Sequence, residues 1–314
     1  MTADLVLRWL RAGDLELPLP GSGRTAQRWR RLSELTEIDV VAGRLAEAHA
    51  DAIAILAELN GPRPRTDELW AVWAAEAPDA VVTACGAGDS LVLNGTKAWC
   101  SGAGLCTHAL VTAQLSGGRR GLFAVDRSGA RPKERIWRNA GMADSDTRSV
   151  QFDSAAAIPV GQPDDYLNRP GFWFGAIGVA ACWLGGARAV AAPLYQRAAA
   201  GSPDGHLLAH LGAIDAAIAG AEATLGAAAQ QVDGDPHNGS GWAELTARRA
   251  RAVVENAVDE ALVRTDRALG PGPLCLDEQH ARAVADLSVY VRQSHAERDL
   301  AELGRLAASG RADG

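Results

Sequence analysis

The chain has 314 residues, 47% of them hydrophobic, which suffices for two or three domains with a sizeable buried core. Its net charge is −7, and no block of Lys and Arg runs longer than two or three residues. This excludes nucleic acids and anionic membrane surfaces as partners, because both require a concentrated basic face. Five cysteines without a CxxC pair predict free thiols in a reducing cytoplasm, not disulfides or a zinc site.

The start of the chain has no basic region followed by a long apolar run, so we expect no signal peptide and a cytoplasmic protein. The most apolar stretch, residues 172–194, contains Arg188 and is dominated by Gly and Ala. Small residues at that density favour close helix packing inside a soluble bundle. We therefore expect no membrane span.

In chain order, the first expected structure is helical. Residues 31–59 carry apolar positions at spacings of three and four. One helical face collects Leu45, His49, Ile53 and Leu56. The string GPRPR then ends the pattern. These features predict a helix pair or one broken helix.

Residues 70–160 have the pattern of strands. Short segments rich in Val, Leu, Thr and aromatic residues alternate with turns of Gly, Asp and Ser. The expected strands are VVTAC (81–85), SLVLNGTKAWC (90–100), HALVTAQL (108–115), GLFAVD (121–126) and SVQFD (149–153). Because no helix-length segment interrupts them, we expect one antiparallel sheet or barrel and not a doubly wound nucleotide-binding fold.

The rest of the chain is expected to be helical. The four predicted helices cover about 171–200, 204–232, 240–269 and 277–307, which favours an up-down four-helix bundle. The predicted fold class is therefore α+β. Its three parts are a short N-terminal helical domain (1–68), a middle β domain (69–161) and a C-terminal helical bundle (162–314).

The most specific string is LNGTKAWCSGAG at 93–104. Its Asn-Gly dipeptide predicts a tight turn that joins two strands. After the turn, Lys97, Trp99 and Ser101 are expected on one strand face, with Cys100 on the opposite, core face. A large aromatic plane with a hydroxyl two residues later can flank a flat heteroaromatic ligand and hydrogen-bond its edge. The alternative interpretation is a plain hairpin with a half-buried Trp.

This string resembles the middle-domain signature of the acyl-CoA dehydrogenase family, LNGxKxWITNG. Residues 141–159, GMADSDTRSVQFDSAAAIP, resemble a second family segment and keep its spacing from Thr147 to Pro159. The resemblance covers nearly the whole chain from about residue 31, with a shortened N-terminal domain. It implies the family fold and an FAD cofactor. It also implies that Trp99 packs on the flavin and that Ser101, which replaces a Thr, bonds the isoalloxazine edge.

Two strings in the helical part extend the resemblance. RAAAG at 197–201 stands where the family has R-x-x-F-G, whose Arg reaches the FAD pyrophosphate of a neighbouring subunit. Arg197 thus implies a dimer or tetramer. RALGPGPL at 267–274 stands where the family has Q-x-x-GG-x-G, a loop that approaches the ADP half of the cofactor. Gly270 is retained and Arg267 replaces Gln, but two prolines replace glycines. Because proline removes backbone donors, we expect altered adenosine-side binding, partly offset if Arg267 pairs with phosphate.

The catalytic carboxylate of the family is missing from both of its usual positions. The EGT-like string of the last helix falls on Ser294-His295-Ala296, and the alternative position on the first bundle helix falls near Gly175. A register slip brings His295 or Glu297 to the site, and an imidazole has a suitable pKa for a base near neutrality. The alternative interpretation is a solvated helix face with ion pairs four residues apart.

Three functional hypotheses follow from the resemblance. The main one is an FAD-dependent acyl-CoA dehydrogenase of lipid metabolism, which oxidises an acyl-CoA thioester and passes electrons to electron-transfer flavoprotein or another acceptor. The second is a non-catalytic subunit that completes an FAD site in a homologous partner, as in some actinobacterial members. The third is a flavin-dependent monooxygenase or oxidase on the same fold, which uses reduced flavin and oxygen and needs no carboxylate.

Overall fold

The computed structural model of the chain describes residues 2–86 and 88–312. These residues form two compact units that alternate along the sequence. One unit, called here the β unit, contains the chain up to Leu17, Arg44–Asn139 and Ala143–Phe172. The other, called the helical unit, contains Pro18–Gly43, Ala140–Met142 and the chain from Trp173 onward. The boundaries 1–68, 69–161 and 162–314 stay predictions.

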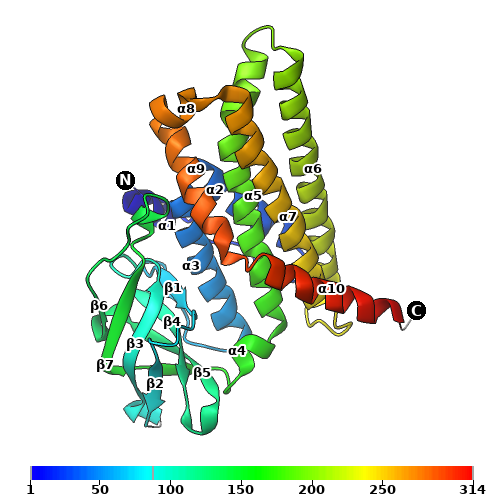
Figure 1. Cartoon of the computed structure of the whole chain (residues 1–314). Helices are drawn as coiled ribbons and strands as arrows, with labels where there is room; N and C mark the ends of the chain where they lie inside the picture. The colour runs from blue at the N-terminus through cyan, green and yellow to red at the C-terminus, as the bar shows by residue number, and fades with distance from the viewer. Residues whose placement is uncertain (1, 87, 313–314) are drawn as a thin grey trace. The chain divides into compact units, whose positions relative to one another are not determined.

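The β unit is built on one curled sheet of eight strands (Figure 1). The strands follow the order β6-β7-β3-β2-β4-β5-β8, and β1 pairs with β4. Their bounds are β1 Trp70–Trp73, β2 Val82–Cys85, β3 Val92–Cys100, β4 His108–Gln114, β5 Arg120–Asp126, β6 Ala130–Pro132, β7 Arg148–Ala156 and β8 Ile158–Val160. All five predicted strands are present within a few residues of their predicted bounds.

The sheet is mixed, and the prediction of a wholly antiparallel sheet is wrong in one place. Strand β4 pairs in parallel with β1 and, at one residue pair, with β2. Parallel neighbours require a long connection, and the segment 74–107 between β1 and β4 supplies it. The remaining pairings are antiparallel.

Two helices belong mainly to the β unit, α1 (Thr2–Ala12) and most of α3 (Val40–Glu58). A third, α4 (Asp165–Asn168), is a single turn. Helix α3 packs on the sheet through the apolar face predicted from its spacing. The core there consists of Ala52, Ile55, Leu56, Trp70, Leu110, Leu122, Ala124 and Val160.

The Asn-Gly dipeptide of the 93–104 string does not form the predicted turn. Strand β3 runs continuously from Val92 to Cys100, and its register against β7 shifts between Leu93 and Gly95. Gly95 has a φ of 117°, and a Cβ there would lie 2.1 Å from the carbonyl oxygen of Val81. The glycine therefore makes a bulge in a strand instead of ending one, because only glycine fits this conformation and this close approach.

The helical unit contains α2 and the C-terminal helices. Their bounds are α2 Thr25–Ile38, α5 Pro170–Ala199, α6 Gly205–Gly234, α7 Ala243–Leu269, α8 Pro271–Leu276, α9 Glu278–Tyr290 and α10 Glu297–Ala312. Three of the four predicted bundle helices match α5, α6 and α7. The fourth, predicted as continuous over 277–307, is broken between α9 and α10. At the break Ser294 is extended and Ala296 has a φ of 45°, which helical geometry does not allow.

Small residues let α5 lie close to its neighbours, as its composition predicts. A Cβ at Gly185 would lie 2.0 Å from the carbonyl oxygen of Ser33 in α2. A Cβ at Gly186 would lie 2.6 Å from the Leu287 side chain in α9. Trp183, which is fully buried, packs its ring against Tyr290 at 86°.

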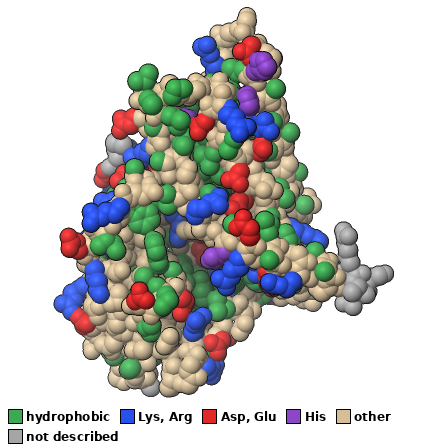
Figure 2. Space-filling model, viewed as in Figure 1, with side chains coloured by type: hydrophobic (Ala, Val, Ile, Leu, Met, Phe, Trp, Pro, Cys, Tyr) green, Lys and Arg blue, Asp and Glu red, His purple; other side chains and the backbone are tan. Residues whose placement is uncertain are grey.

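Helices α5 and α6 are long and apolar enough, by length and composition alone, to cross a membrane. Of the most apolar window of each helix, 72% is buried inside the protein in α5 and 28% in α6. Figure 2 shows Lys and Arg side chains interspersed with Asp and Glu over the face in view, without the single-sign block that nucleic acid requires.

Candidate functional site

Trp99 stands on an irregular part of β3. The register of β3 against β7 shifts again between Lys97 and Cys100, and Trp99 has a φ of 60°. A left-handed conformation in a residue with a large side chain costs about 1 kcal/mol or more. The bulge turns the indole outward, so that 61% of Trp99 is exposed. Its ring meets Trp137 edge to face at 6.2 Å between centroids.

Lys97 and Trp99 do not share a strand face, contrary to the prediction, because the bulge breaks the alternation between them. Lys97 is buried, and its Nζ donates to the Thr112 carbonyl oxygen at 3.0 Å and to Thr112 Oγ1 at 2.7 Å. Burial lowers the pKa of Lys97, an effect that Glu76, 3.7 Å away, partly opposes. Cys100 lies in the core, as predicted, and burial raises the pKa of its thiol.

Ser101 belongs to a cluster of three hydroxyls. Thr147 Oγ1 lies 3.0 Å from Ser101 Oγ and 2.7 Å from Ser145 Oγ. The Gly102 amide donates to the Ser145 carbonyl at 2.8 Å. The Gly104 amide donates to an Asp146 carboxylate oxygen at 2.8 Å. The two strings quoted above for their family resemblance are thus joined directly, and their hydroxyls meet in one place.

A hollow of about 330 Å³ in the β unit meets this hydroxyl cluster at Ser145. The residues that line it also include Leu45 of α3, Leu105 and Arg135, but not Trp99, Ser101 or Thr147. An exposed indole, a group of hydroxyls that can donate or accept, and an adjoining hollow are the features that hold a flat heteroaromatic group. The residues present therefore fit a flavin ring, which needs an aromatic face and polar partners at its edge.

The two predicted phosphate-side arginines lie in the helical unit. Arg197 is exposed in the last turn of α5, and Arg267 is exposed in the last turn of α7. Helices α5 and α7 run in the same direction, so both arginines lie at the same end of this unit (Figure 1). Gly270 has a φ of 67° and separates α7 from α8. Pro271 is the first residue of α8, a position where the missing amide hydrogen removes no helical hydrogen bond.

The sequence comparison predicts that the turn at 294–296 lacks the family carboxylate. Ser294 is 6% exposed, and its Oγ donates to Glu255 Oε2 at 2.6 Å. The next side chain, His295, is 68% exposed, and its Nδ1 lies 3.7 Å from Asp299 Oδ2. Glu297 is exposed and begins α10. The structure thus places His295 beside a carboxylate four residues away, a contact that suits both a catalytic role and a solvated helix face.

Arg251 connects the two positions from which the family takes its base. Its Nη1 donates to the Ala176 carbonyl at 3.0 Å, next to Gly175, and its Nη2 donates to the Gln293 carbonyl at 3.4 Å, next to Ser294. The guanidinium lies 4.5 Å above the Trp183 ring. Burial lowers the pKa of Arg251.

Sequence reasoning missed Arg251 and Glu255. A signal for both was present, because charged residues recur every three or four positions along the helix predicted over 240–269. Such a stripe is usually a solvated face. Here it packs against the turn between α9 and α10.

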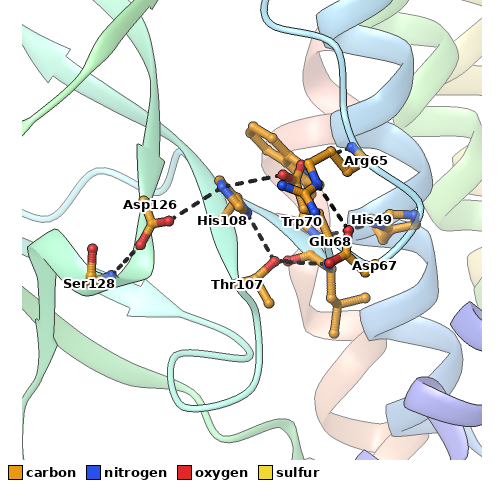
Figure 3. Close-up of polar contacts among 10 residues, drawn as sticks. His49, Arg65, Asp67, Glu68, Trp70, Thr107, His108, Asp126 and Ser128 are labelled. Atoms are coloured by element: carbon orange, nitrogen blue, oxygen red, sulfur yellow. Dashed lines mark hydrogen bonds and ion pairs between the residues drawn. The ribbon is translucent and has the colours of Figure 1, made fainter.

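A second polar cluster lies in the β unit (Figure 3). The His108 ring stacks on Trp70 at 4.8 Å and lies 3.7 Å from Glu68 and 3.6 Å from Asp126. The Trp70 amide donates to His49 Nδ1 at 3.1 Å, and hydrogen bonds from Ser128 lower the pKa of Asp126. No group of His, Cys, Asp and Glu among the described residues can hold a metal ion. The cluster fastens the segment before β1 to β4 and β5.

Comparison with known families tests the resemblance to the acyl-CoA dehydrogenase family. The profile of the acyl-CoA dehydrogenase middle domain matches residues 75–155. The chain thus carries the middle domain of the acyl-CoA dehydrogenase-like superfamily. The matched residues include Trp99, Ser101 and Thr147, so the motif resemblance and the family match rest on the same segment. No curated protein matches the chain.

Solved structures with the acyl-CoA dehydrogenase-like fold resemble the chain over most of its length. The complex of TdsC from Paenibacillus sp. A11-2 with FMN and indole has a TM-score of 0.77 and 19% identity, covering 89% of this chain and 82% of TdsC. The 3-HSA hydroxylase from Rhodococcus sp. RHA1 has a TM-score of 0.78 and 13% identity, covering 98% and 92%. Methanesulfinate monooxygenase MsuC from Pseudomonas fluorescens has a TM-score of 0.75 and 16% identity, covering 98% and 96%. At these identities the likeness establishes the fold alone.

Proposed function

We propose that the chain is a flavin-dependent monooxygenase, which consumes reduced flavin and oxygen to oxygenate a small organic substrate. One observation carries this proposal: the residues that pack on the flavin in the family are retained, whereas the catalytic carboxylate of the family is missing. Trp99, Ser101 and Thr147 provide an aromatic plane and hydroxyls, whereas Ser294 stands where a dehydrogenase has its Glu. Acyl-CoA dehydrogenation needs a carboxylate at the α proton, and oxygen activation by reduced flavin does not.

Several of the solved structures that resemble the chain favour the same choice. Two are a dibenzothiophene monooxygenase and a methanesulfinate monooxygenase, and a third is a hydroxylase. We therefore place oxygenation ahead of acyl-CoA dehydrogenation, which was the main prediction from the sequence.

We propose FMN as the flavin in place of the predicted FAD. The similar solved structures of TdsC and KijD3 include complexes with FMN. In this chain, Pro271 and Pro273 occupy the loop whose glycine backbone approaches the ADP half of FAD in the family. Proline supplies no amide donor there, and FMN has no ADP half to bind. A nanomolar to micromolar affinity for FMN with weaker binding of FAD would support this choice.

When bound, the flavin supplies the two electrons that activate oxygen. The residues of this chain do the remaining work. Trp99 would flank the ring system, and Ser101 and Thr147 would hydrogen-bond its edge. In this proposal His295, held by Asp299, moves a proton at Nε2 during the reaction, since an imidazole exchanges protons near neutral pH. Arg197 serves the flavin phosphate of a second copy or a homologous subunit.

The test is oxygen uptake by the purified protein with FMN, NADH and a separate flavin reductase, with indole as the first substrate probe. Substrate-dependent uptake with formation of an oxygenated product supports the proposal. Uptake that yields only hydrogen peroxide, with indole and with a panel of sulfur and phenolic compounds, counts against it. A Trp99→Ala variant controls for flavin chemistry in free solution.

A second candidate is an acyl-CoA dehydrogenase with a relocated base, and one observation favours it. The Glu255 carboxylate is only 2.6 Å from Ser294 Oγ, and its side chain is 14% exposed. A buried carboxylate one hydroxyl away from the family position is a chemically reasonable base. This function requires an acyl-CoA thioester to reduce the bound flavin without oxygen, and an acceptor such as electron-transfer flavoprotein.

A further inference from the structure

One face of α7 carries a stripe of charged residues of both signs. It consists of Glu244, Arg248, Arg251, Glu255 and Asp259, spaced three or four residues apart. On a helix, residues at this spacing lie one above another. Side chains with this composition usually project into solvent. Here Arg248, Arg251 and Glu255 are largely covered.

The stripe is directed at the residues that join α9 to α10. Arg251 Nη2 donates to the Gln293 carbonyl, and Glu255 Oε2 accepts from Ser294 Oγ at 2.6 Å. Arg292 lies 3.5 Å from Glu255 and 3.6 Å from Asp259. At the other side of the turn, Arg248 Nη1 donates to Asp299 Oδ1 at 3.4 Å. The helix thus holds this connection at both of its ends.

The connection needs such support because its backbone is strained. Ala296 has a φ of 45°, which a residue with a Cβ rarely adopts. The Ala296 amide donates to Ser294 Oγ at 3.1 Å, and the His295 amide donates to Asp299 Oδ2 at 3.0 Å. Ser294 Oγ therefore has two partners, one within the turn and one on α7. Of these contacts, the bond to Glu255 is the one that fixes the turn to another helix.

We propose that Glu255 is a positioning residue, which acts through Ser294 to fix the turn that presents the His295 ring. This inference rests on the proposed function, in which His295 moves a proton. Asp299 completes the arrangement, because it holds both the His295 amide and the Nδ1 side of the ring and is itself held by Arg248. Nε2 is the atom of His295 to which the proposed function assigns the proton transfer.

The proposal gives Glu255 the role of an acceptor and not of a base. What matters is an oxygen that accepts from Ser294 Oγ, so the isosteric amide in Glu255→Gln retains the function. The Glu255→Leu side chain is similar in volume but accepts nothing, so it releases the turn. Asp259→Asn is the matched control, because Asp259 lies one turn further along the same face and forms an ion pair with Arg292 at 3.6 Å.

The experiment measures hydrogen–deuterium exchange of the full-length protein over residues 291–299, together with oxygen uptake in the FMN, NADH and reductase assay. For Glu255→Leu we expect exchange at the Ala296 amide to rise about ten-fold or more, in line with the loss of a charge-assisted hydrogen bond. Turnover is expected to fall about as much while FMN affinity stays unchanged. For Glu255→Gln and Asp259→Asn, both quantities are expected to stay within about two-fold of the parent protein.

Three results overturn the inference. Unchanged exchange in a folded Glu255→Leu protein means that Glu255 does not hold the turn. Inactive Glu255→Gln with normal exchange means that the carboxylate itself takes a proton, as the dehydrogenase candidate requires. Raised exchange with full turnover means that the turn is not part of the reaction. If Glu255→Leu does not fold, Ser294→Ala removes the same bond from the other side. Because this variant also removes the acceptor of the Ala296 amide, its exchange is read at the other amides of residues 291–299, and its turnover is held to the same expectation.

If the parent protein shows no oxygen uptake at all, the proposed function fails. The exchange measurement still decides whether Glu255 holds the turn, because it requires no turnover.

Discussion

The indole rings of Trp99 and Trp137 meet at 88°, edge to face, with their centroids 6.2 Å apart. Trp99 comes from a bulge in β3, and Trp137 comes from the segment that follows β6. The pair orients an indole that is otherwise largely exposed, so that the ring is held before any ligand stacks on it. Preorganisation of this kind reduces the entropy lost on binding.

Trp99→Ala is expected to weaken FMN binding with little effect on folding. Stacking of a base on an aromatic side chain contributes about 1–3 kcal/mol, which corresponds to about ten-fold to a hundred-fold in Kd. Quenching of flavin fluorescence measures the affinity, and thermal unfolding measures the stability. Trp242→Ala is the control, since Trp242 is also partly exposed, at 45%, but lies in the helical unit. Equal FMN affinity in both variants would remove Trp99 from the site.

Gly95→Ala is expected to destabilise the protein by about 2 kcal/mol or more, because the new methyl group would meet the Val81 carbonyl and the φ of 117° would be strained. Gly117→Ala provides the comparison. It also has a positive φ, of 80°, but its Cβ would meet nothing within 4 Å. We expect a loss of only about 1 kcal/mol there. Urea unfolding measures the loss of stability in each variant. Equal losses would show that the close approach of Gly95 to the Val81 carbonyl is unimportant.

Asp286 gives the protein a pH dependence in the acidic range. Burial raises the pKa of this carboxyl to about 6, although it accepts from the Met142 amide at 2.5 Å and faces Arg282. The raised pKa means that the folded state binds the proton more tightly than the unfolded state does. The stability linked to this proton is complete below about pH 4 and is lost as the pH rises through 6.

Asp286→Asn removes the loss of stability at higher pH, because the amide oxygen can still accept from the Met142 amide while no charge is buried. We expect the variant to be more stable than the parent above pH 6, by up to about 3 kcal/mol. Thermal unfolding between pH 4 and 8 measures the difference. A variant that is less stable at pH 7 would show that the ion pair with Arg282 outweighs the burial of the charge.

The pH dependence of stability linked to Lys97 has the opposite sign to that linked to Asp286. Burial lowers the pKa of its ammonium, so the unfolded state binds the proton more tightly. Stability is therefore expected to rise with pH between the lowered pKa and the ordinary value near 10.5. Lys97→Met should abolish that rise, which unfolding in urea between pH 7 and 10.5 would detect. An unchanged slope in the variant would assign the pH dependence to another group.

Much of the fold follows from periodicity in the sequence. Short apolar segments between turns located β4 and β5, and spacings of three and four between apolar residues located α3. The irregular parts of the fold could not be predicted from periodicity. The bulges that put Gly95 inside a strand and turn Trp99 away from Lys97 break the period of two on which face assignments depend.

The sequence predicted the site residues that belong to short motifs, but not those that are brought together only by long-range contacts. Ser101 and Thr147 were both named from their strings, and the structure joins them at 3.0 Å. Glu255 and Ser294 are far apart in sequence, and no spacing rule relates them. The break before α10 has no Pro or Gly to mark it, since Ala296 adopts the left-handed conformation.

The most direct test of the central claim is the visible absorption spectrum of the flavin-loaded protein, recorded without oxygen before and after addition of a mixture of acyl-CoA thioesters. We predict that the flavin band persists, because the sequence comparison puts Ser294 at the position of the dehydrogenase base. We also predict that NADH with a flavin reductase then supports oxygen-dependent turnover. Bleaching of the band by an acyl-CoA would contradict the account and establish dehydrogenation instead.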